Sequence, residues 1–220
     1  MRKGWGYEQD QQSTTHSVAG SVANTSVADS NFDGITYSKG AASLKNLISV
    51  LGQKIFAKSM NEYFKKYQWG NSTLEQLLEI IQGNLPKDDY KLNRYVDNFK
   101  QDYLVEIGMN EIQPVRVCVD KENTGSEALR IRQSNVMKNL TTLRHHYIKI
   151  AFFDEEARIV KVKDLLMDKE EYTSVDIDFE ENYKAILLNY QDLDFVKVRL
   201  DHISRKFFRK NFGKLDQKDD

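Results

Sequence analysis

Between Asp33 and Gly108 the hydrophobic positions repeat at helical spacing. Apolar side chains lie three or four residues apart, which places them on one face of an α-helix. The pattern runs through four stretches, residues 41–51, 56–67, 74–81 and 92–107. The sequence therefore predicts that residues 33–108 are helical.

Local signals divide these four stretches from one another. Gly52 and Gly108 follow the first and the last stretch, where glycine commonly ends a helix. Trp69-Gly70-Asn71 predicts a break before the third, and Ser72 with Glu75 fits a capping box that would start it. Pro86 separates the third stretch from the fourth.

After Pro114 the period of the pattern falls from about 3.6 residues to two, which is typical of β-strands. Val115, Val117 and Val119 alternate with Arg116 and Cys118. Turn-like stretches at 120–126 and 154–156 interrupt the pattern. Six strands are predicted, at 115–119, 129–132, 147–153, 159–162, 173–179 and 185–188, and their short, regular spacing favours a small antiparallel sandwich. Residues 195–212 read as a further strand leading into a short helix.

The first thirty residues show no periodic apolar pattern and are rich in Ser, Thr, Gln and Ala, so we expect an irregular segment. The fold class expected for the whole chain is α+β. The expected division is a helical part over 1–113, a β-sandwich domain over 114–201 and a tail over 202–220.

Charge gives no general argument for a nucleic-acid or membrane partner, because 32 Lys and Arg stand against 33 Asp and Glu. The one basic cluster is Arg205, Lys206, Arg209 and Lys210. It could bind phosphate, but the solvated end of an amphipathic tail is the favoured explanation, since Asp216, Asp219 and Asp220 offset it. No stretch has the roughly 20 apolar residues of a membrane span. A single cysteine and a start without a signal-peptide pattern lead us to expect a cytoplasmic protein.

The residue types that bind metals or act as nucleophiles are sparse. The four histidines, His16, His145, His146 and His202, form no His-Glu-x-x-His pattern. His145 and His146 begin a predicted strand and should point to opposite faces, which argues against joint metal ligation. Cys118 lies in an alternating strand, where a thiol is usually a small buried hydrophobe. We therefore predict no metal-binding and no cofactor-binding residues in this chain.

One segment resembles a known signature. The run from Asn31 to Ala42, Asn-Phe-Asp-Gly-Ile-Thr-Tyr-Ser-Lys-Gly-Ala-Ala, resembles the tyrosine segment of the aminopeptidase N family, which carries Tyr-x-Lys-Gly-Ala. Further stretches, in the order the family has them, resemble that family up to Asp201: Trp5-Gly6-Tyr7, Asp10-Gln11, Thr15-His16, Trp69 to Leu74, Gly108 to Pro114, Thr142 to His145 and Phe195 to Asp201.

The resemblance implies a zinc metallo-aminopeptidase that releases single amino acids from the N-termini of peptides. In that family a zinc-activated water attacks, a glutamate is the base and a tyrosine hydroxyl stabilises the oxyanion. Only Tyr37 maps onto those roles, and a phenol can donate a hydrogen bond to developing negative charge. The alternative for Tyr37 is an aromatic side chain packed in the core at a helix start. The implied fold is the helical C-terminal part of a thermolysin-like catalytic domain, followed by a small β-sandwich.

This sequence departs from the family in two respects. The zinc ligands and the base lie upstream of the tyrosine segment in the family, so the chain is expected to lack them and to be inactive alone. Ser17 follows His16 where relatives usually carry proline, which affects the expected loop geometry.

The resemblance fits three hypotheses. The chain could be a fragment of a zinc aminopeptidase, a non-enzymatic interaction module, or one half of a split enzyme whose zinc-bearing half is a separate partner chain. An exposed apolar patch along the 41–51 helix would favour the interaction module.

Overall fold

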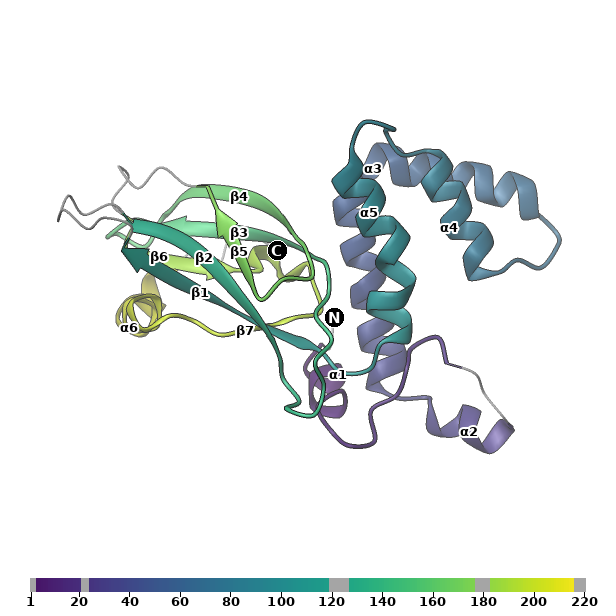
Figure 1. Cartoon of the computed structure of the whole chain (residues 1–220), viewed down its shortest axis with the longest axis horizontal. Helices are drawn as coiled ribbons and strands as arrows, with labels where there is room; N and C mark the ends of the chain where they lie inside the picture. The colour runs from purple at the N-terminus through teal and green to yellow at the C-terminus, as the bar shows by residue number, and fades with distance from the viewer. Residues whose placement is uncertain (1–2, 21–23, 119–126, 177–182, 216–220) are drawn as a thin grey trace. The chain divides into compact units, whose positions relative to one another are not determined.

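A computed structural model of the chain describes residues 3–20, 24–118, 127–176 and 183–215. The chain divides into two compact units, Met1–Ile107 and Gly108–Asp220. The first contains helices and the second contains the strands (Figure 1). The fold is therefore mixed, with antiparallel sheets, as the fold class predicted. The boundary lies six residues before the expected one, because the first strand begins at Asn110.

The first unit consists of five α-helices and two π-helical turns within the described residues. In chain order they are α1 (Lys3–Gln9), α2 (Thr25–Ser30), η1 (Ile35–Lys39), α3 (Gly40–Tyr67), α4 (Leu74–Gly83), α5 (Tyr90–Phe99) and η2 (Lys100–Val105).

The expectation of an irregular start is wrong for two short stretches, α1 and α2. The side chain of Asn24 caps α2 by accepting the N–H of Val27, yet α2 buries no residue. Helices of seven and six residues make fewer than two turns each, so they cannot show the repeating apolar stripe that identifies a helix in a sequence.

Gly52 interrupts α3, as the pattern predicted. Its φ of 71° and ψ of 159° are not helical, so the two predicted helices are the two halves of this element. A positive φ is accessible to glycine without steric cost. Figure 1 shows α3 running beside α5.

The start of α4 lies one residue later than predicted. Thr73 and Gln76 form the capping box, not Ser72 and Glu75. The Ser72 hydroxyl instead shares a hydrogen bond with the hydroxyl of Tyr63 on α3. Ser72 and Thr73 can both cap a helix, and the hydrogen bond of Ser72 with Tyr63 explains why Thr73 is the cap.

Aromatic packing holds α5 and η2 in the core of this unit. Tyr95, Phe99 and Tyr103 are buried, and their ring centroids lie 6.4 Å and 5.4 Å apart in succession. The hydroxyl of Tyr95 donates a hydrogen bond to the side chain of Asn46 on α3. The aromatic residues at helical spacing are therefore core residues that join the two helices.

The second unit contains two sheets. One has the strand order β5-β2-β1-β7 and the other β4-β3-β6. The described strands are β1 (Asn110–Cys118), β2 (Glu127–Asn135), β3 (His146–Phe153), β4 (Ile159–Met167), β5 (Tyr172–Val175), β6 (Ala185–Leu188) and β7 (Lys197–Val198). The predicted turn at 120–126, the predicted strand residues 177–179 and the side chain of Cys118 lie outside the described residues.

The two sheets pack face to face around one apolar core. Ile112, Leu129 and Ile131 from the first sheet and Ile148 and Ile150 from the second belong to the same buried cluster. This arrangement is a sandwich, as the alternation predicted. One pairing differs from the antiparallel expectation, because β7 runs parallel to β1.

The strand β1 passes through Pro114, whereas the prediction started it at Val115. Pro114 pairs with Ile131 of β2, whereas β7 reaches only Glu111 and Ile112. At Pro114 the strand therefore has a single partner strand, and an edge of this kind tolerates proline, which lacks an N–H donor.

A final helix, α6 (His202–Asn211), follows β7, as the pattern over 195–212 predicted. Its Phe207 and Phe208 pack against the cluster of Ala151, Phe153 and Ala185. This contact explains why both faces of β3 are buried at its end. Among the described helices of the chain, none combines the length and hydrophobicity that crossing a bilayer requires.

The adjacent histidines are both buried and have different partners. His146 Nδ1 lies 2.6 Å from Asp194 Oδ2, and His145 Nε2 lies 3.7 Å from Asp168 Oδ1. The guanidinium of Arg144 donates to the Gly108 carbonyl at 2.8 Å and to the Asn110 side chain at 3.1 Å. His146 Nε2 also lies 3.3 Å from Asn110 Oδ1, so His146, Asn110 and Arg144 belong to one hydrogen-bonded network within the sandwich unit.

Replacement of Leu47 should destabilise the helical unit. Leu47 is 2% exposed, whereas Leu44 on the same helix is 46% exposed. We expect Leu47→Ala to lower the free energy of unfolding by about 2 to 5 kcal/mol, because it removes apolar contacts and leaves a cavity. Leu44→Ala should change it by less than about 0.5 kcal/mol. Urea unfolding followed by helical circular dichroism tests both, and equal losses for the two variants would contradict the assignment of Leu47 to the core.

Candidate functional site

Tyr37 lies at the surface of the helical unit, in the π-helical turn η1. Its side chain is 53% exposed, and its ring centroid is 5.8 Å from that of Phe32. Both rings line a hollow of about 210 Å³, whose other walls are Val18, Gly20, Ala28, Asn31 and Thr36. Within the described residues, nothing forms a hydrogen bond with the Tyr37 hydroxyl. The phenol is therefore not a core residue, and it can meet a ligand.

Asp33 fixes the start of this turn. Its Oδ1 accepts the N–H groups of Ile35 at 2.9 Å and Thr36 at 3.0 Å, so the carboxylate caps the turn. Its Oδ2 lies 3.1 Å from Nε2 of His16, and Nδ1 of His16 lies 2.9 Å from the Ser17 carbonyl. The side chain that holds the turn is thus itself held by the preceding loop.

Ser17 ties that loop to the end of the unit. Its hydroxyl donates to the carbonyl of Val105 at 2.5 Å, and the N–H of Ala19 donates to the carbonyl of Leu104 at 2.8 Å. A proline has no hydroxyl and could not make the first contact. Serine at this position therefore makes a hydrogen bond that proline could not make.

Gly34 allows α1 to approach the turn closely. Its N–H donates to Oε1 of Gln9 at 2.5 Å. A Cβ atom at Gly34 would lie 2.9 Å from the backbone carbon of Trp5, which is closer than real contacts allow. Glycine is therefore required here by the proximity of α1 and not by backbone conformation.

Lys39 anchors the other end of the turn through a buried ion pair. Its Nζ lies 3.1 Å from Oδ2 of Asp10, and the two side chains are 1% and 0% exposed. The same ammonium donates to the Glu106 carbonyl at 3.1 Å. Asp10 Oδ1 accepts the hydroxyl of Thr15 at 2.6 Å. Both ions therefore have hydrogen-bond partners besides each other, which buried charges require.

Sequence reasoning selected Tyr37 but missed the residues that position it. Gln9, Asp10, Asp33 and Lys39 contact one another or the turn, although they are up to 30 residues apart in the chain. A signal was present, because Asp10, His16 and Lys39 all belong to the stretches that carry the family resemblance. Their partners could not be assigned without the fold.

The described residues do not fit a zinc ion. No group of three or more His, Cys, Asp or Glu side chains among them is arranged to hold a metal. His16 and Asp33 lie together, but two protein ligands are fewer than a catalytic zinc site commonly has. What these residues can offer chemically is an exposed phenol on a turn that is held at both ends.

Breaking the buried ion pair should destabilise the helical unit. Lys39→Met leaves the Asp10 carboxylate buried without its cation, so we expect a loss of about 3 to 5 kcal/mol in the free energy of unfolding. Asp10→Asn combined with Lys39→Met should lose less, because both charges of the pair are then removed together. Chemical denaturation of the three proteins measures this coupling.

The surface ion pair of Lys100 with Glu75 provides the control, since both side chains are largely exposed. Lys100→Met should have a far smaller effect than Lys39→Met, because water screens that pair. If the double variant at Asp10 and Lys39 proved as unstable as Lys39→Met alone, the charge interaction would not be the cause.

Comparison with known proteins relates these residues to a known family. Residues 5–103 match the Peptidase family M1 domain, a range that includes Tyr37, Asp10 and Lys39. Aminopeptidase N of Streptomyces lividans is 30% identical over 220 residues, covering 96% of this chain and 25% of that relative. Leucyl aminopeptidase of Saccharolobus solfataricus is 27% identical over 210 residues, covering 96% of this chain and 24% of that relative.

The fold agrees with these matches. The crystal structure of Legionella pneumophila aminopeptidase A in complex with aspartic acid matches 79% of this chain and 19% of its own length, with a TM-score of 0.60 and 19% identity. This chain spans about a quarter of the length of the two relatives that match it almost throughout. Residues 5–103 thus match the Peptidase family M1 domain, and the chain is similar to one part of its aminopeptidase relatives, as a fragment of that family would be.

Proposed function

We propose that this chain is a part of a zinc-dependent aminopeptidase that releases N-terminal amino acids from peptides, with Tyr37 as the hydrogen-bond donor to the oxyanion. The observation that carries the proposal is the exposed phenol of Tyr37 beside a hollow, on a turn fixed at both ends by Asp33 and Lys39. The relatives' names support an aminopeptidase activity.

The contribution of Tyr37 follows from what a fixed phenol can do. When a peptide carbonyl is attacked, negative charge develops on its oxygen, and a donor already aimed at that position stabilises the transition state without rearrangement. The capped and ion-paired turn would supply such a preorganised donor. The Phe32 ring beside Tyr37 gives the hollow an apolar wall, where a substrate side chain could pack.

Zinc and the general base would have to come from residues other than those described. The described residues have no set of ligands that fits the metal. The chemistry that we derive for this chain is therefore limited to the phenol and its support.

An exposed apolar stripe, which on the sequence alone was expected to favour an interaction module, also fits a zinc-bearing second half packed on it. Phe32, Tyr37 and Leu44 are 67%, 53% and 46% exposed, and Ala41 lies exposed between the last two at helical spacing. We infer that this stripe receives the zinc-bearing half of a catalytic domain, fused or as a separate chain. The alternative is a non-enzymatic module that uses the same stripe to bind a peptide or a full-length relative.

Zinc retention tests the first part of the proposal. We expect the purified chain to retain substoichiometric zinc after dialysis against a weak chelator and to leave aminoacyl substrates intact, because a catalytic site commonly needs three protein ligands. Elemental analysis and a fluorogenic aminopeptidase assay measure these properties. One zinc per chain after dialysis would contradict the expectation.

Reconstitution tests the role of Tyr37. The zinc-bearing half would be supplied from the Streptomyces lividans relative, fused or in trans. If activity returns, Tyr37→Phe should lower turnover by about 10² to 10³, the usual loss for one oxyanion donor, with little change in substrate binding.

Tyr90→Phe is the matched control, because Tyr90 is also an exposed phenol, at 68%, on a different helix. This variant should keep full turnover. A Tyr37→Phe protein that retained more than half of the wild-type turnover would show that Tyr37 has a structural role only. Failure of every fusion to gain activity, despite binding of the two halves, would favour the interaction module.

A further inference from the structure

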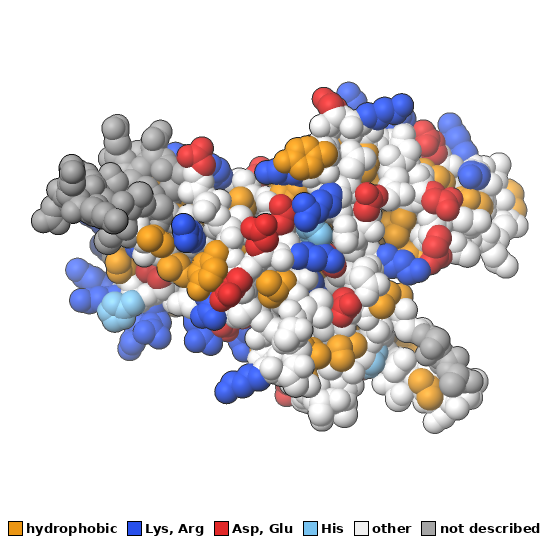
Figure 2. Space-filling model, in the orientation of Figure 1, with side chains coloured by type: hydrophobic (Ala, Val, Ile, Leu, Met, Phe, Trp, Pro, Cys, Tyr) orange, Lys and Arg blue, Asp and Glu red, His pale blue; other side chains and the backbone are white. Residues whose placement is uncertain are grey.

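The helix α6 and the turn after it carry a cluster of positive charges with no acidic residue among them. Residues 202–214 contain Arg205, Lys206, Arg209, Lys210 and Lys214, and no Asp or Glu, in a chain whose net charge is −1. Figure 2 shows Lys and Arg side chains gathered over this helix, at the lower left of the view. Although the chain as a whole is nearly neutral, residues 202–214 therefore produce a strong local positive potential.

These cations are placed where they repel one another. Lys206 and Lys210 are four residues apart on one face of α6, as are Arg205 and Arg209, and like charges at that spacing destabilise a helix. All five cations are exposed, and none of them has an ion-pair partner among the described residues of the sandwich unit. An anion bound along this face would remove the repulsion.

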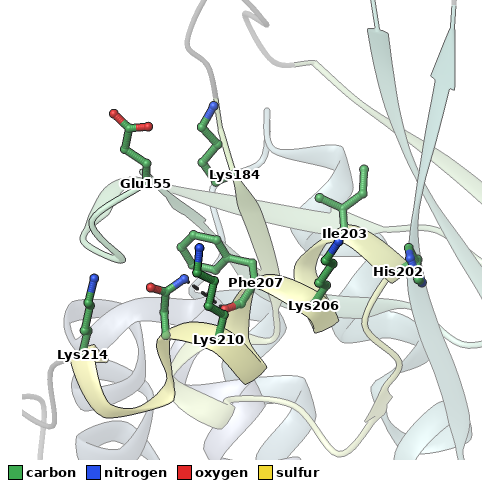
Figure 3. A pocket seen from close by; sticks show the side chains of 9 residues that line it. Glu155, Lys184, His202, Ile203, Lys206, Phe207, Lys210 and Lys214 are labelled. Atoms are coloured by element: carbon green, nitrogen blue, oxygen red, sulfur yellow. Dashed lines mark hydrogen bonds between the residues drawn. The ribbon is translucent and has the colours of Figure 1, made fainter.

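A hollow of about 540 Å³ lies beside this charge, between α6 and the loops that carry Glu155 and Lys184. Its volume lies in the range of small-molecule sites. Figure 3 shows the Phe207 ring facing this hollow, with Lys206 and Lys210 on the neighbouring turns of the helix. The hollow therefore combines an aromatic wall with several cations.

We propose that this hollow binds a nucleotide, with the phosphates at Lys206, Lys210 and Lys214 and the base against Phe207. Ammonium groups bind phosphate oxygens as strongly charged donors, and a base can stack on an aromatic ring whatever its identity. Four residues of helix rise about 6 Å, so Lys206 and Lys210 can contact successive phosphates. The Glu155 carboxylate at the opposite rim can accept hydrogen bonds from a ribose or an amino group.

The same geometry disfavours an anionic membrane surface. A helix that lies in a lipid interface needs a free apolar face. The apolar face of α6 is largely occupied, since the ring centroids of Phe208 and Phe153 lie 5.1 Å apart. Phe207 is partly buried against the same cluster, and its ring also lines the hollow.

Calorimetric titration of the full chain with ADP tests the proposal, with inorganic tripolyphosphate and adenosine as the two partial probes. We expect ADP to bind more tightly than either probe, because only ADP engages both the cations and the ring. Lys206→Glu with Lys210→Glu should weaken ADP binding at least about tenfold, since two charge-assisted contacts become repulsive.

Lys54→Glu with Lys58→Glu is the matched control. These lysines are exposed on α3 at the same spacing and do not line the hollow, so the variant has the same change in net charge without altering the hollow itself. It should retain ADP binding within about twofold, because exposed charges that do not contact the ligand are screened by salt. Any general effect of net charge would appear equally in both double variants.

Phe207→Leu tests the aromatic wall. It should weaken ADP binding about tenfold and leave tripolyphosphate binding unchanged. Phe208→Leu should affect the melting temperature and not ADP binding, because Phe208 packs inward. Equal binding of ADP and tripolyphosphate, tighter binding of an oligonucleotide or of anionic vesicles, or equal losses in the two lysine double variants would each overturn the proposal.

Discussion

The buried ion pair of Lys39 with Asp10 is the interaction on which the arrangement of the candidate site depends. Two charges removed from water are tolerated only when the partner is close and the remaining hydrogen-bonding capacity is satisfied. The Thr15 hydroxyl, which donates to Asp10, and the Glu106 carbonyl, which accepts from Lys39, meet part of that requirement. The pair therefore specifies one geometry, in which α1, the tyrosine turn and the end of the helical unit lie together. A hydrophobic contact in its place would be non-directional and would specify this arrangement less well.

The exposed phenol of Tyr37 can contact a ligand, and the buried residues next to its turn stabilise the turn. Tyr37 makes no hydrogen bond with described residues through its hydroxyl, so its direction is set by the backbone of η1. That backbone is capped by Asp33 on one side and held by Lys39 on the other. A π-helical turn is uncommon and is often found at functional sites. It places the residue that can contact a ligand on a segment whose neighbours make the stabilising contacts.

Much of this fold could be predicted from the sequence, and the differences have physical causes. The stripe containing Leu47, the break at Gly52 and the alternation around Ile131 and Ile150 are local patterns, and the structure follows them. The start of α4 was predicted one residue too early, because Ser72 has a partner on another helix. The helix α1 was missed because it is too short for a periodic pattern.

The candidate site was predictable only in part, because the contacts that support it join residues far apart in the sequence. Tyr37 was selected by a resemblance in a short run of residues. Its supporting contacts, such as Gln9 with Gly34 and Ser17 with Val105, join residues 25 and 88 positions apart. Periodicity carries no information about such pairs. The charge of α6 was visible in the sequence, but the hollow beside it depends on Glu155 and Lys184 from other segments.

The contact between Ser17 and Val105 also has a consequence for the order in which the chain folds. It closes a loop of 88 residues, and closing a flexible loop of that length costs about 4 kcal/mol of chain entropy. Helices α3, α4 and α5 follow one another directly in the chain and need no such closure to pack. We therefore expect the helices to assemble first and to shorten the effective loop before the tyrosine turn is fixed. The segment bearing the phenol would then be the last part of its unit to become ordered and the first to open.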